Sequence, residues 1–345
     1  MSKRKGFDST GKRRFVCLSC RRTFGKPKKL TTNFSDLVKF RDFIVNKLNK
    51  EAVLEKEYIS RTSLWRKFKP FFSYSPTPED SVFLLSINTL NVDEPTPWTL
   101  GIDGKWLRRQ GVIMIYRDVT NKLNLYWSFH LSESYAAIEK DFERLNPIIK
   151  YSLPSGVITD WKGAIVSAVN IYLTSSIPHQ RCLAHVQREL LRLLPLRSPF
   201  PETQKLRIIA KVIIDIKTHE EKYYWMTSVN YWISKHQDIL NKKTIGVDTK
   251  KKWWYTHGNL RRAVKLLTFD EKHLFTYLDY PFVPDTNNSL EGSNSQIKTK
   301  LSNHRGMKTP QQVTYLFWLF TFRRVKNRRD LKMLWDSLKN KIHRL

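Results

Sequence analysis

Apolar residues recur at two different spacings along this chain. In residues 34–50 and 55–72 they recur every three or four positions, which predicts two amphipathic helices. From about residue 95 to residue 132, three apolar runs are separated by Gly or by Asn-Lys turns, which predicts a meander of antiparallel strands. The pattern then alternates helix, strand, helix and strand through residue 186. This order predicts an α/β domain whose mixed sheet carries helices on its faces.

The two N-terminal helices, expected within residues 31–75, each have an apolar and a basic face. Ser60 is placed to cap the second helix, whose Leu64, Trp65 and Phe68 are expected to face inward. The outward face carries Arg61, Thr62, Arg66 and Lys67. Two such helices joined by a short turn are typical of a helix-turn-helix DNA-binding domain. An ordinary helical pair with a solvated basic face is the alternative interpretation.

The charge of the chain indicates a polyanionic partner. Its 345 residues include 61 Lys and Arg against 31 Asp and Glu, a formal net charge of +30. Residues 1–70 alone hold 20 basic and 6 acidic side chains, so they contribute +14. We therefore expect nucleic acid as the partner rather than a membrane surface. The sequence has no apolar run long enough to span a bilayer and no apolar stretch of a signal peptide at its start, so we expect a cytoplasmic, nucleoid-associated protein.

Three cysteines cannot form a disulfide framework, which agrees with a reducing compartment. Cys17 and Cys20, in the basic segment 1–30, have the spacing of half a zinc knuckle. The sequence has no other Cys before residue 182 and no His before residue 130, so two further Zn²⁺ ligands are missing from this region. A truncated start, a zinc site shared between subunits and a remnant without metal all remain open.

Two acidic residues fall at notable places in the expected sheet. Asp103 lies inside the first apolar strand, and Asp160 lies at the end of the fourth. A carboxylate inside an apolar strand is costly to bury unless it binds a metal or is otherwise paired. Side chains at strand ends in an α/β sheet converge on the crevice where ligands bind. Asp160 has a second interpretation, because Asp commonly caps the helix that follows a strand.

A third candidate ligand, Glu291, lies at the start of a predicted helix. Asn288 and Glu291 have the N-cap and N3 spacing of a capping box, so this carboxylate also has a structural interpretation. The same helix brings Glu291, Asn294 and Lys298 onto one polar face. Gly292 costs about 1 kcal/mol inside a helix, and it would let another backbone or DNA come close. We interpret Glu291 as a ligand, because a carboxylate beside a lysine at a helix start suits a metal ion and a phosphate.

Four segments together resemble the DDE transposases of bacterial insertion sequences and their Mutator-like relatives. They are GIDGKW (101–106), VITDWKGAI (157–165), HQRCLAHVQREL (179–190) and TNNSLEGSNSQIKTKLSNHRG (286–306). The similarity covers about residues 95–310, and the last segment is the most specific. It implies a ribonuclease H-like catalytic core with an all-helical insertion at about residues 190–280. Residues 311–345 are expected to form a C-terminal helix.

The resemblance assigns Asp103, Asp160 and Glu291 as catalytic, metal-binding acids. DNA cleavage and strand transfer are in-line displacements at phosphorus, and two Mg²⁺ ions about 3.5–4 Å apart stabilise both the attacking and the leaving oxygen. Mg²⁺ takes one or two carboxylates together with phosphate and water, so three acids suffice for two ions. Mn²⁺ is expected to substitute for Mg²⁺.

Cys182 and His185 form a Cys-x-x-His pair that can seed a zinc site. The sequence has no second pair nearby, and in the resembling family the pair recurs close to the active site. We therefore interpret Cys182 and His185, with Asn294 and Lys298, as support for the acids, and Zn²⁺ as the alternative.

These features favour a transposase that binds double-stranded DNA at the ends of its element and at the target. Two ends must be handled together, so a homodimer or a larger oligomer is expected. A catalytically silent DNA-binding protein derived from such an enzyme is one alternative, although all three acids are present. A ribonuclease H-like nuclease without strand transfer is the other.

Overall fold

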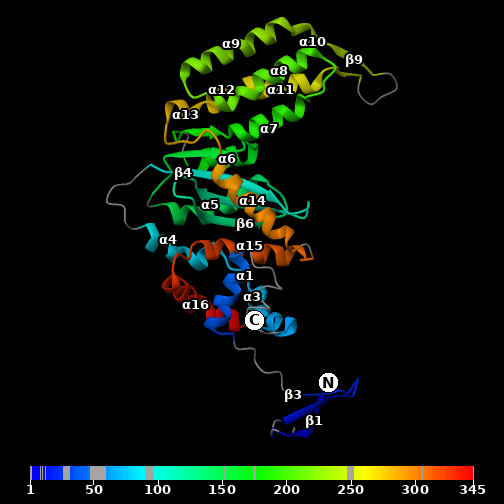
Figure 1. Cartoon of the computed structure of the whole chain (residues 1–345), viewed down its shortest axis with the longest axis vertical. Coiled ribbons are helices and arrows are strands. Elements are labelled where there is room, and N and C mark those ends of the chain that lie inside the picture. The colour runs from blue at the N-terminus through cyan, green and yellow to red at the C-terminus, as the bar shows by residue number, and fades with distance from the viewer. Residues whose placement is uncertain are drawn as a thin grey trace. The chain divides into compact units, whose positions relative to one another are not determined.

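The computed structural model of the chain (Figure 1) consists of two compact units. Unit 1 comprises Met1–Tyr74 and Leu331–Leu345, and unit 2 comprises Ser75–Asp330. The residues that the structure describes are 2–7, 9, 11, 13–25, 32–46, 60–89, 97–150, 152–173, 176–246, 252–304 and 306–344.

Unit 2 is built on a five-stranded mixed sheet with the strand order β6-β5-β4-β7-β8. Its strands are β4 (Thr99–Trp106), β5 (Val112–Asp118), β6 (Leu123–His130), β7 (Gly156–Thr159) and β8 (His179–Arg181). The first three form the expected antiparallel meander, and β7 and β8 run parallel to β4. Ile102 of β4 pairs with Thr159, the last residue of β7, so the end of β7 lies beside Asp103. The expectation of an α/β fold with a mixed sheet is confirmed.

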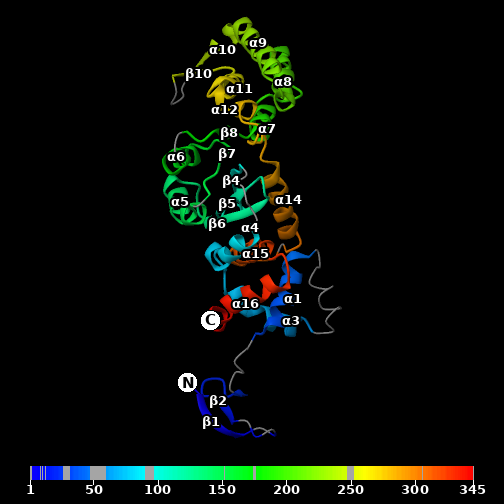
Figure 2. The same ribbon diagram turned by 90° about the vertical axis from the view of Figure 1, so that its left-hand side faces the viewer.

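Helices cover both faces of this sheet. They are η1 (Pro78–Ser81), α4 (Val82–Thr89), α5 (Tyr135–Ile149), α6 (Gly163–Tyr172), α14 (Asn288–Ser302) and α15 (Thr309–Arg323). Side chains alternate along a strand, so Leu100 and Ile102 pack with α5 and α6 while Asp103 points to the other face. On that other face α14 contacts β4, and Phe320 of α15 packs on Trp127 with ring centroids 5.5 Å apart. Figure 2 shows α5 and α6 on one side of the sheet and α14 on the other.

Between β8 and α14 the chain leaves the sheet and forms an insertion with its own apolar core, which includes Leu190, Val229 and Leu260. Its elements are α7 (Leu183–Leu193), α8 (Pro201–Lys211), η2 (Val212–Asp215), α9 (His219–Lys235), α10 (Gln237–Asn241), β9 (Lys243–Ile245), β10 (Trp253–Tyr255), α11 (Gly258–Thr268), α12 (Glu271–Leu274) and α13 (Thr276–Asp279). We expected only helices here, and this was wrong for β9 and β10, which pair antiparallel. The aromatic residues of β10 favour an extended chain.

The chain enters and leaves this insertion at one place, which we call the neck. The Leu183 N–H donates to the carbonyl of Asp285 at 2.9 Å. The buried Gln180 side chain donates to the carbonyl of Leu274 at 2.9 Å and accepts from the Tyr277 N–H at 3.1 Å. The start of α7 and the chain that leads into α14 are therefore held together.

Unit 1 contains a small antiparallel sheet and a group of helices. Its elements are β1 (Ser2–Phe7), β2 (Arg13–Cys17), β3 (Thr23–Gly25), α1 (Phe34–Val45), α3 (Arg61–Ser73) and most of α16 (Arg328–His343). Phe40 of α1 stacks on Phe71 of α3 with ring centroids 4.8 Å apart, and Lys332 of α16 lies over the ring of Phe34. Both expected helices are present. The turn expected between them falls within residues 47–59, which lie outside the described residues, so the helix-turn-helix stays a prediction.

Two local expectations about helices differ from the structure. Trp65 was expected to face inward but is 41% exposed, because the buried line of α3 runs through Leu64, Phe68 and Phe71. Residues 311–345 were expected to form one helix but contain most of α15 and then α16. A turn separates the two helices, and in it the Lys326 N–H donates to the Asp330 carboxylate at 2.8 Å. Within the described ranges, no helix combines the length and apolarity needed to cross a membrane.

Candidate active site

Asp103 is a buried carboxylate on the central strand. It is 6% exposed. One of its oxygens accepts a hydrogen bond from the Gly104 N–H at 2.9 Å, and the other accepts from Asn294 Nδ2 at 2.7 Å. Because Asn294 lies on α14, this second bond ties the central strand to the helix that carries Glu291.

The electrostatic environment of Asp103 opposes its ionisation. The pKa of Asp103 is raised to about 6, chiefly because burial removes water from the carboxylate. His185 acts against this rise, Asp160 adds to it, and Lys162 acts against it. Two acids are thus close enough to repel one another in a partly dry site. A divalent cation between them would relieve both the repulsion and the loss of hydration.

Asp160 directly follows β7, at the end of the strand beside β4. Lys162 places its ammonium 3.0 Å from Asp160 and 2.6 Å from Glu133, so it bridges two carboxylates. Trp161 between them has a φ of 66°, in the left-handed region that side chains other than Gly rarely adopt. The alternative that Asp160 caps the next helix is wrong, because α6 begins at Gly163 with Lys162 as its N-cap residue.

Glu291 lies in the first turn of α14, and its carboxylate meets two residues of α7. Its Oε1 accepts a hydrogen bond from Arg188 at 2.8 Å and lies 3.9 Å from Nδ1 of His185. The capping box expected from Asn288 is wrong, because the N–H of Glu291 bonds to the carbonyl of Asn287 and the helix therefore begins one residue earlier. The side chain of Glu291 turns toward α7 and not back to the cap.

Asn294 and Lys298 share the face of α14 that carries Glu291, as three- and four-residue spacing requires. Lys298 is exposed. Asn294 donates through Nδ2 to Asp103, while its buried Oδ1 has no hydrogen-bond partner among the described residues. Carboxylate and unpaired amide oxygens are the hard donors that Mg²⁺ and Mn²⁺ prefer. The residues present therefore fit a divalent cation of this kind.

Cys182 and His185 sit beside Glu291 at the neck. Their ligand atoms and a Glu291 carboxylate oxygen lie within 4.8 Å of one another. Cys182 is fully buried, burial raises the pKa of its thiol to about 11, and its sulfur accepts a hydrogen bond from the Asn287 N–H at 3.3 Å. This environment favours a packing role, in which Cys182 pins the start of α14 to the start of α7.

Three charged residues of this region were missed by sequence reasoning. They are Glu133, Lys162 and Arg188. Lys162 lies two positions after Asp160, and Arg188 lies three positions after His185, which places it on the same face of α7. Those spacings were the available signals. Glu133 follows β6 and carries no local signal, since its contact with Lys162 joins separate parts of the chain.

The N-terminal cysteines lie at the end of β2 and in the turn that follows. The N–H of Cys17 donates to the carbonyl of Arg22, and the carbonyl of Cys17 accepts from the Arg21 N–H. Hydrogen bonds from the backbone of Cys20 and Ser19 lower the pKa of the Cys17 thiol. This tight turn is suited to two ligands, but the missing second pair leaves zinc a prediction.

The basic residues expected to contact DNA lie on the first turns of α3. Arg61, Thr62 and Arg66 are exposed on one side of the helix. Lys67 points elsewhere and forms an ion pair with Asp36 of α1, with an N–O distance of 3.2 Å. Their role in DNA binding stays a prediction.

Comparison with known proteins adds one finding to this geometry. The sequence model of a family described as Transposase IS66 family matches residues 164–312. The matched residues include Cys182, His185 and Glu291, whereas Asp103 and Asp160 precede them. No curated protein matches the chain. The match supports a transposase of an insertion sequence, which is the class expected from the sequence, and it gives no support to the Mutator-like group in particular.

Proposed function

We propose that this chain is a DDE transposase whose acids Asp103, Asp160 and Glu291 bind two divalent metal ions. The observation that carries the proposal is the arrangement of these residues around the point where β7 ends beside β4. Asp103 lies on β4, Asp160 follows the adjacent β7, and Glu291 lies one turn from the Asn294 that bonds to Asp103. The strand order β6-β5-β4-β7-β8 supports a ribonuclease H-like core. In this sheet β5 is antiparallel to both β4 and β6, whereas β7 and β8 run parallel to β4.

The proposed chemistry is cleavage of a DNA phosphodiester by water, followed by attack of the freed 3′-hydroxyl on target DNA. Two bound Mg²⁺ or Mn²⁺ ions would supply charge stabilisation for the attacking and leaving oxygens. The chain's own part is to hold its acids in position before any ion arrives. Asn294 orients Asp103 through a 2.7 Å hydrogen bond, and Lys162 orients Asp160 through a 3.0 Å ion pair.

On the insertion side of the site, Arg188 forms an ion pair with Glu291, and His185 Nδ1 lies 3.9 Å from the same carboxylate. The Arg188 guanidinium partly compensates the charge of Glu291. Glu291 would be one of the acids that hold a divalent metal ion, and the Arg188 guanidinium beside it would be placed to meet a DNA phosphate.

The proposed partner is double-stranded DNA, bound by a homodimer or larger assembly. Support comes from the net charge of +30 and from the exposed Arg61 and Arg66 on α3. In this proposal unit 1 reads the element end and unit 2 performs the cleavage.

The experiment is a Mg²⁺-dependent cleavage and strand-transfer assay on DNA that carries the element ends. We expect Asp103→Asn, Asp160→Asn and Glu291→Gln each to abolish both reactions while end binding is retained. Glu189→Gln is the matched control, because Glu189 lies on α7 and pairs with Arg192 on the same helix. Its activity should equal that of the wild type.

Three results would contradict the proposal in different ways. Cleavage retained by one of the acid variants removes that residue from the site. Cleavage without strand transfer in the wild type favours a nuclease. End binding without any cleavage by the wild type favours a catalytically silent DNA-binding protein.

A further inference from the structure

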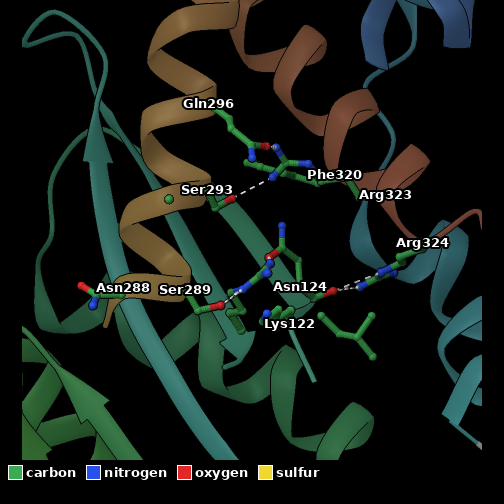
Figure 3. Close-up of a pocket in the computed structure, with 12 residues that line it drawn as sticks. Lys122, Asn124, Asn288, Ser289, Ser293, Gln296, Phe320, Arg323 and Arg324 are labelled. Atoms are coloured by element: carbon green, nitrogen blue, oxygen red, sulfur yellow. Dashed lines mark hydrogen bonds between the residues drawn. The ribbon is translucent and has the colours of Figure 1, made fainter. Parts of the chain in front are cut away.

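A second polar site lies on the opposite face of α14 from the acids. It is a pocket of about 430 Å³ between α14, the β5–β6 hairpin and α15 (Figure 3). Successive helical residues are rotated by about 100°, so Ser289, Ser293 and Gln296 face away from Glu291 and Asn294. The pocket is therefore separate from the catalytic acids, with the thickness of α14 between them.

Arg117 enters this pocket from β5 with neutral hydrogen-bond partners. Its Nε donates to Ser289 Oγ at 2.9 Å, and one terminal nitrogen donates to Asn124 Oδ1 at 2.6 Å. Burial is the main reason that the pKa of Arg117 falls to about 10, and the positive charge of Arg323 lowers it further. Asp118 offsets this effect only in part.

Arg323 enters the pocket from α15 in the same manner. Its two terminal nitrogens donate to Ser293 Oγ and to Gln296 Oε1, each at 2.7 Å. Figure 3 shows the bond to Ser293 on the side of the pocket formed by α14. None of the described residues lining the pocket is Asp or Glu. The guanidinium groups of Arg117 and Arg323 thus repel one another in a partly buried space whose described lining holds no acid and includes two further cations, Lys122 and Arg324.

Asn124 adds a donor whose partner is missing. This residue is 4% exposed, and its Nδ2 has no hydrogen-bond partner within the described part of the chain. The amide orientation follows from chemistry, because Arg117 can only donate and must therefore face Oδ1 of Asn124. Leaving a buried donor unpaired costs roughly 1–3 kcal/mol. This donor therefore has no acceptor among the described residues of the pocket.

Two further features suit an anion. The first turn of the 15-residue α14, with Asn288 and Ser289, lines the pocket and contributes the positive end of the helix dipole. Gly292 also lines it, and a Cβ atom at this position would meet no described atom within 4 Å. Gly292 therefore leaves open space beside the start of the helix, at a cost of about 1 kcal/mol relative to Ala.

We propose that this pocket binds a phosphate group, with Arg117, Arg323 and the Asn124 amide as its donors. Guanidinium groups match the oxygens of phosphate, and they do so best where the surroundings are partly dry. The source of that phosphate is the backbone of bound DNA. Only this assignment of the source rests on the proposed function. Because α14 separates the pocket from the acids, the bound phosphodiester is a different one from the phosphodiester that is cleaved.

The test compares Gly292→Glu with Gly292→Gln in the full chain. Both side chains have the same size and enter the open space, but only Glu places a negative charge beside the two arginines. Circular dichroism and thermal unfolding check that both variants fold. Calorimetric titration with inorganic phosphate, in EDTA, should give at least tenfold weaker binding for Gly292→Glu than for Gly292→Gln. Arg323→Gln should weaken phosphate binding in the same way.

A duplex oligonucleotide is the second probe, titrated in EDTA at several salt concentrations. The negative slope of log affinity against log salt should be shallower by about 1 in Gly292→Glu than in Gly292→Gln, because one phosphate contact is lost. Equal phosphate affinities in the two variants would overturn the pocket. Weaker phosphate binding with unchanged DNA binding would overturn DNA as its source. Since neither measurement requires metal or cleavage, these outcomes are independent of whether the chain is a transposase.

Discussion

Replacing Asp103 by Asn is expected to stabilise the metal-free protein while abolishing cleavage. The pKa of Asp103 is about 6 in the folded chain, against an ordinary value of 3.8. When folding raises the pKa of a carboxyl group, the folded protein loses stability as the pH rises from the ordinary pKa of that group to its raised pKa. Asn does not titrate, so the variant escapes this loss.

The size of the effect follows from the shift. At 1.36 kcal/mol per pKa unit, a difference between about 6 and 3.8 corresponds to about 3 kcal/mol at pH 8 and roughly half of that at pH 5. For a unit of this length, 1 kcal/mol moves Tm by roughly 2–4 °C. We therefore expect Asp103→Asn to raise Tm by about 6–12 °C at pH 8.

The assay is thermal unfolding of the wild type and the variant in EDTA at both pH values, repeated with Mg²⁺. Mg²⁺ should stabilise the wild type by mass action and the variant much less, because the variant has lost a charged ligand. Asp141→Asn is the control. Asp141 is also buried, but it already accepts hydrogen bonds from Tyr116, Ser128 and His130, so its replacement should lower Tm.

A lower Tm for Asp103→Asn in EDTA at pH 8 would refute this reasoning. Such a result would mean that the bonds from Gly104 and Asn294 already satisfy the carboxylate in the folded chain. Asp103 would then resemble Asp141, a structural acid, and the proposal that Asp103 is a metal ligand would lose this support.

Three further variants probe the surroundings of the site. Gly101→Ala should cost about 1–3 kcal/mol in urea unfolding, because its Cβ would lie 2.5 Å from Val119 Cγ1 and 3.0 Å from Leu290 Cδ1 of α14; an unchanged stability would contradict this packing. Arg324→Leu should cost about 3–5 kcal/mol in the same assay, because several buried carbonyls lose their donor; a loss below about 1 kcal/mol would contradict it. Arg188→Ala should lower the Mg²⁺ concentration needed for half-maximal cleavage, since it removes a cation that competes for Glu291; an unchanged requirement would show that the ion pair does not compete.

The sheet could be predicted because its signals are local. Alternation of side chains along β4 places Asp103 on one face, and the apolar run before Asp160 marks the end of β7. The fold class and the order of strands and helices along the chain therefore followed from periodicity, whereas the place of β7 beside β4 did not, and the resemblance supplied the expected roles of the acids.

The failures arise where distant segments compete for a side chain. The spacing of Asn288 and Glu291 satisfies a capping box, but Arg188 from α7 offers Glu291 a charged partner, and a charge-assisted bond outweighs a cap. Trp65 fits the apolar side of α3 by composition, yet the stripe that meets α1 is narrower than the pattern suggested. Neither outcome has a signal within one helix.

The neck has a consequence for how this architecture can vary. A single backbone hydrogen bond joins Leu183 to Asp285, so the chain is already brought back to its starting point before α14 begins. The sheet and α14 therefore place no requirement on the length of what lies between those residues. A shorter or longer segment grafted there would leave the register of every strand in the sheet unchanged, provided that the contacts of the insertion with Thr99, His179 and Gln180 of the sheet were rebuilt.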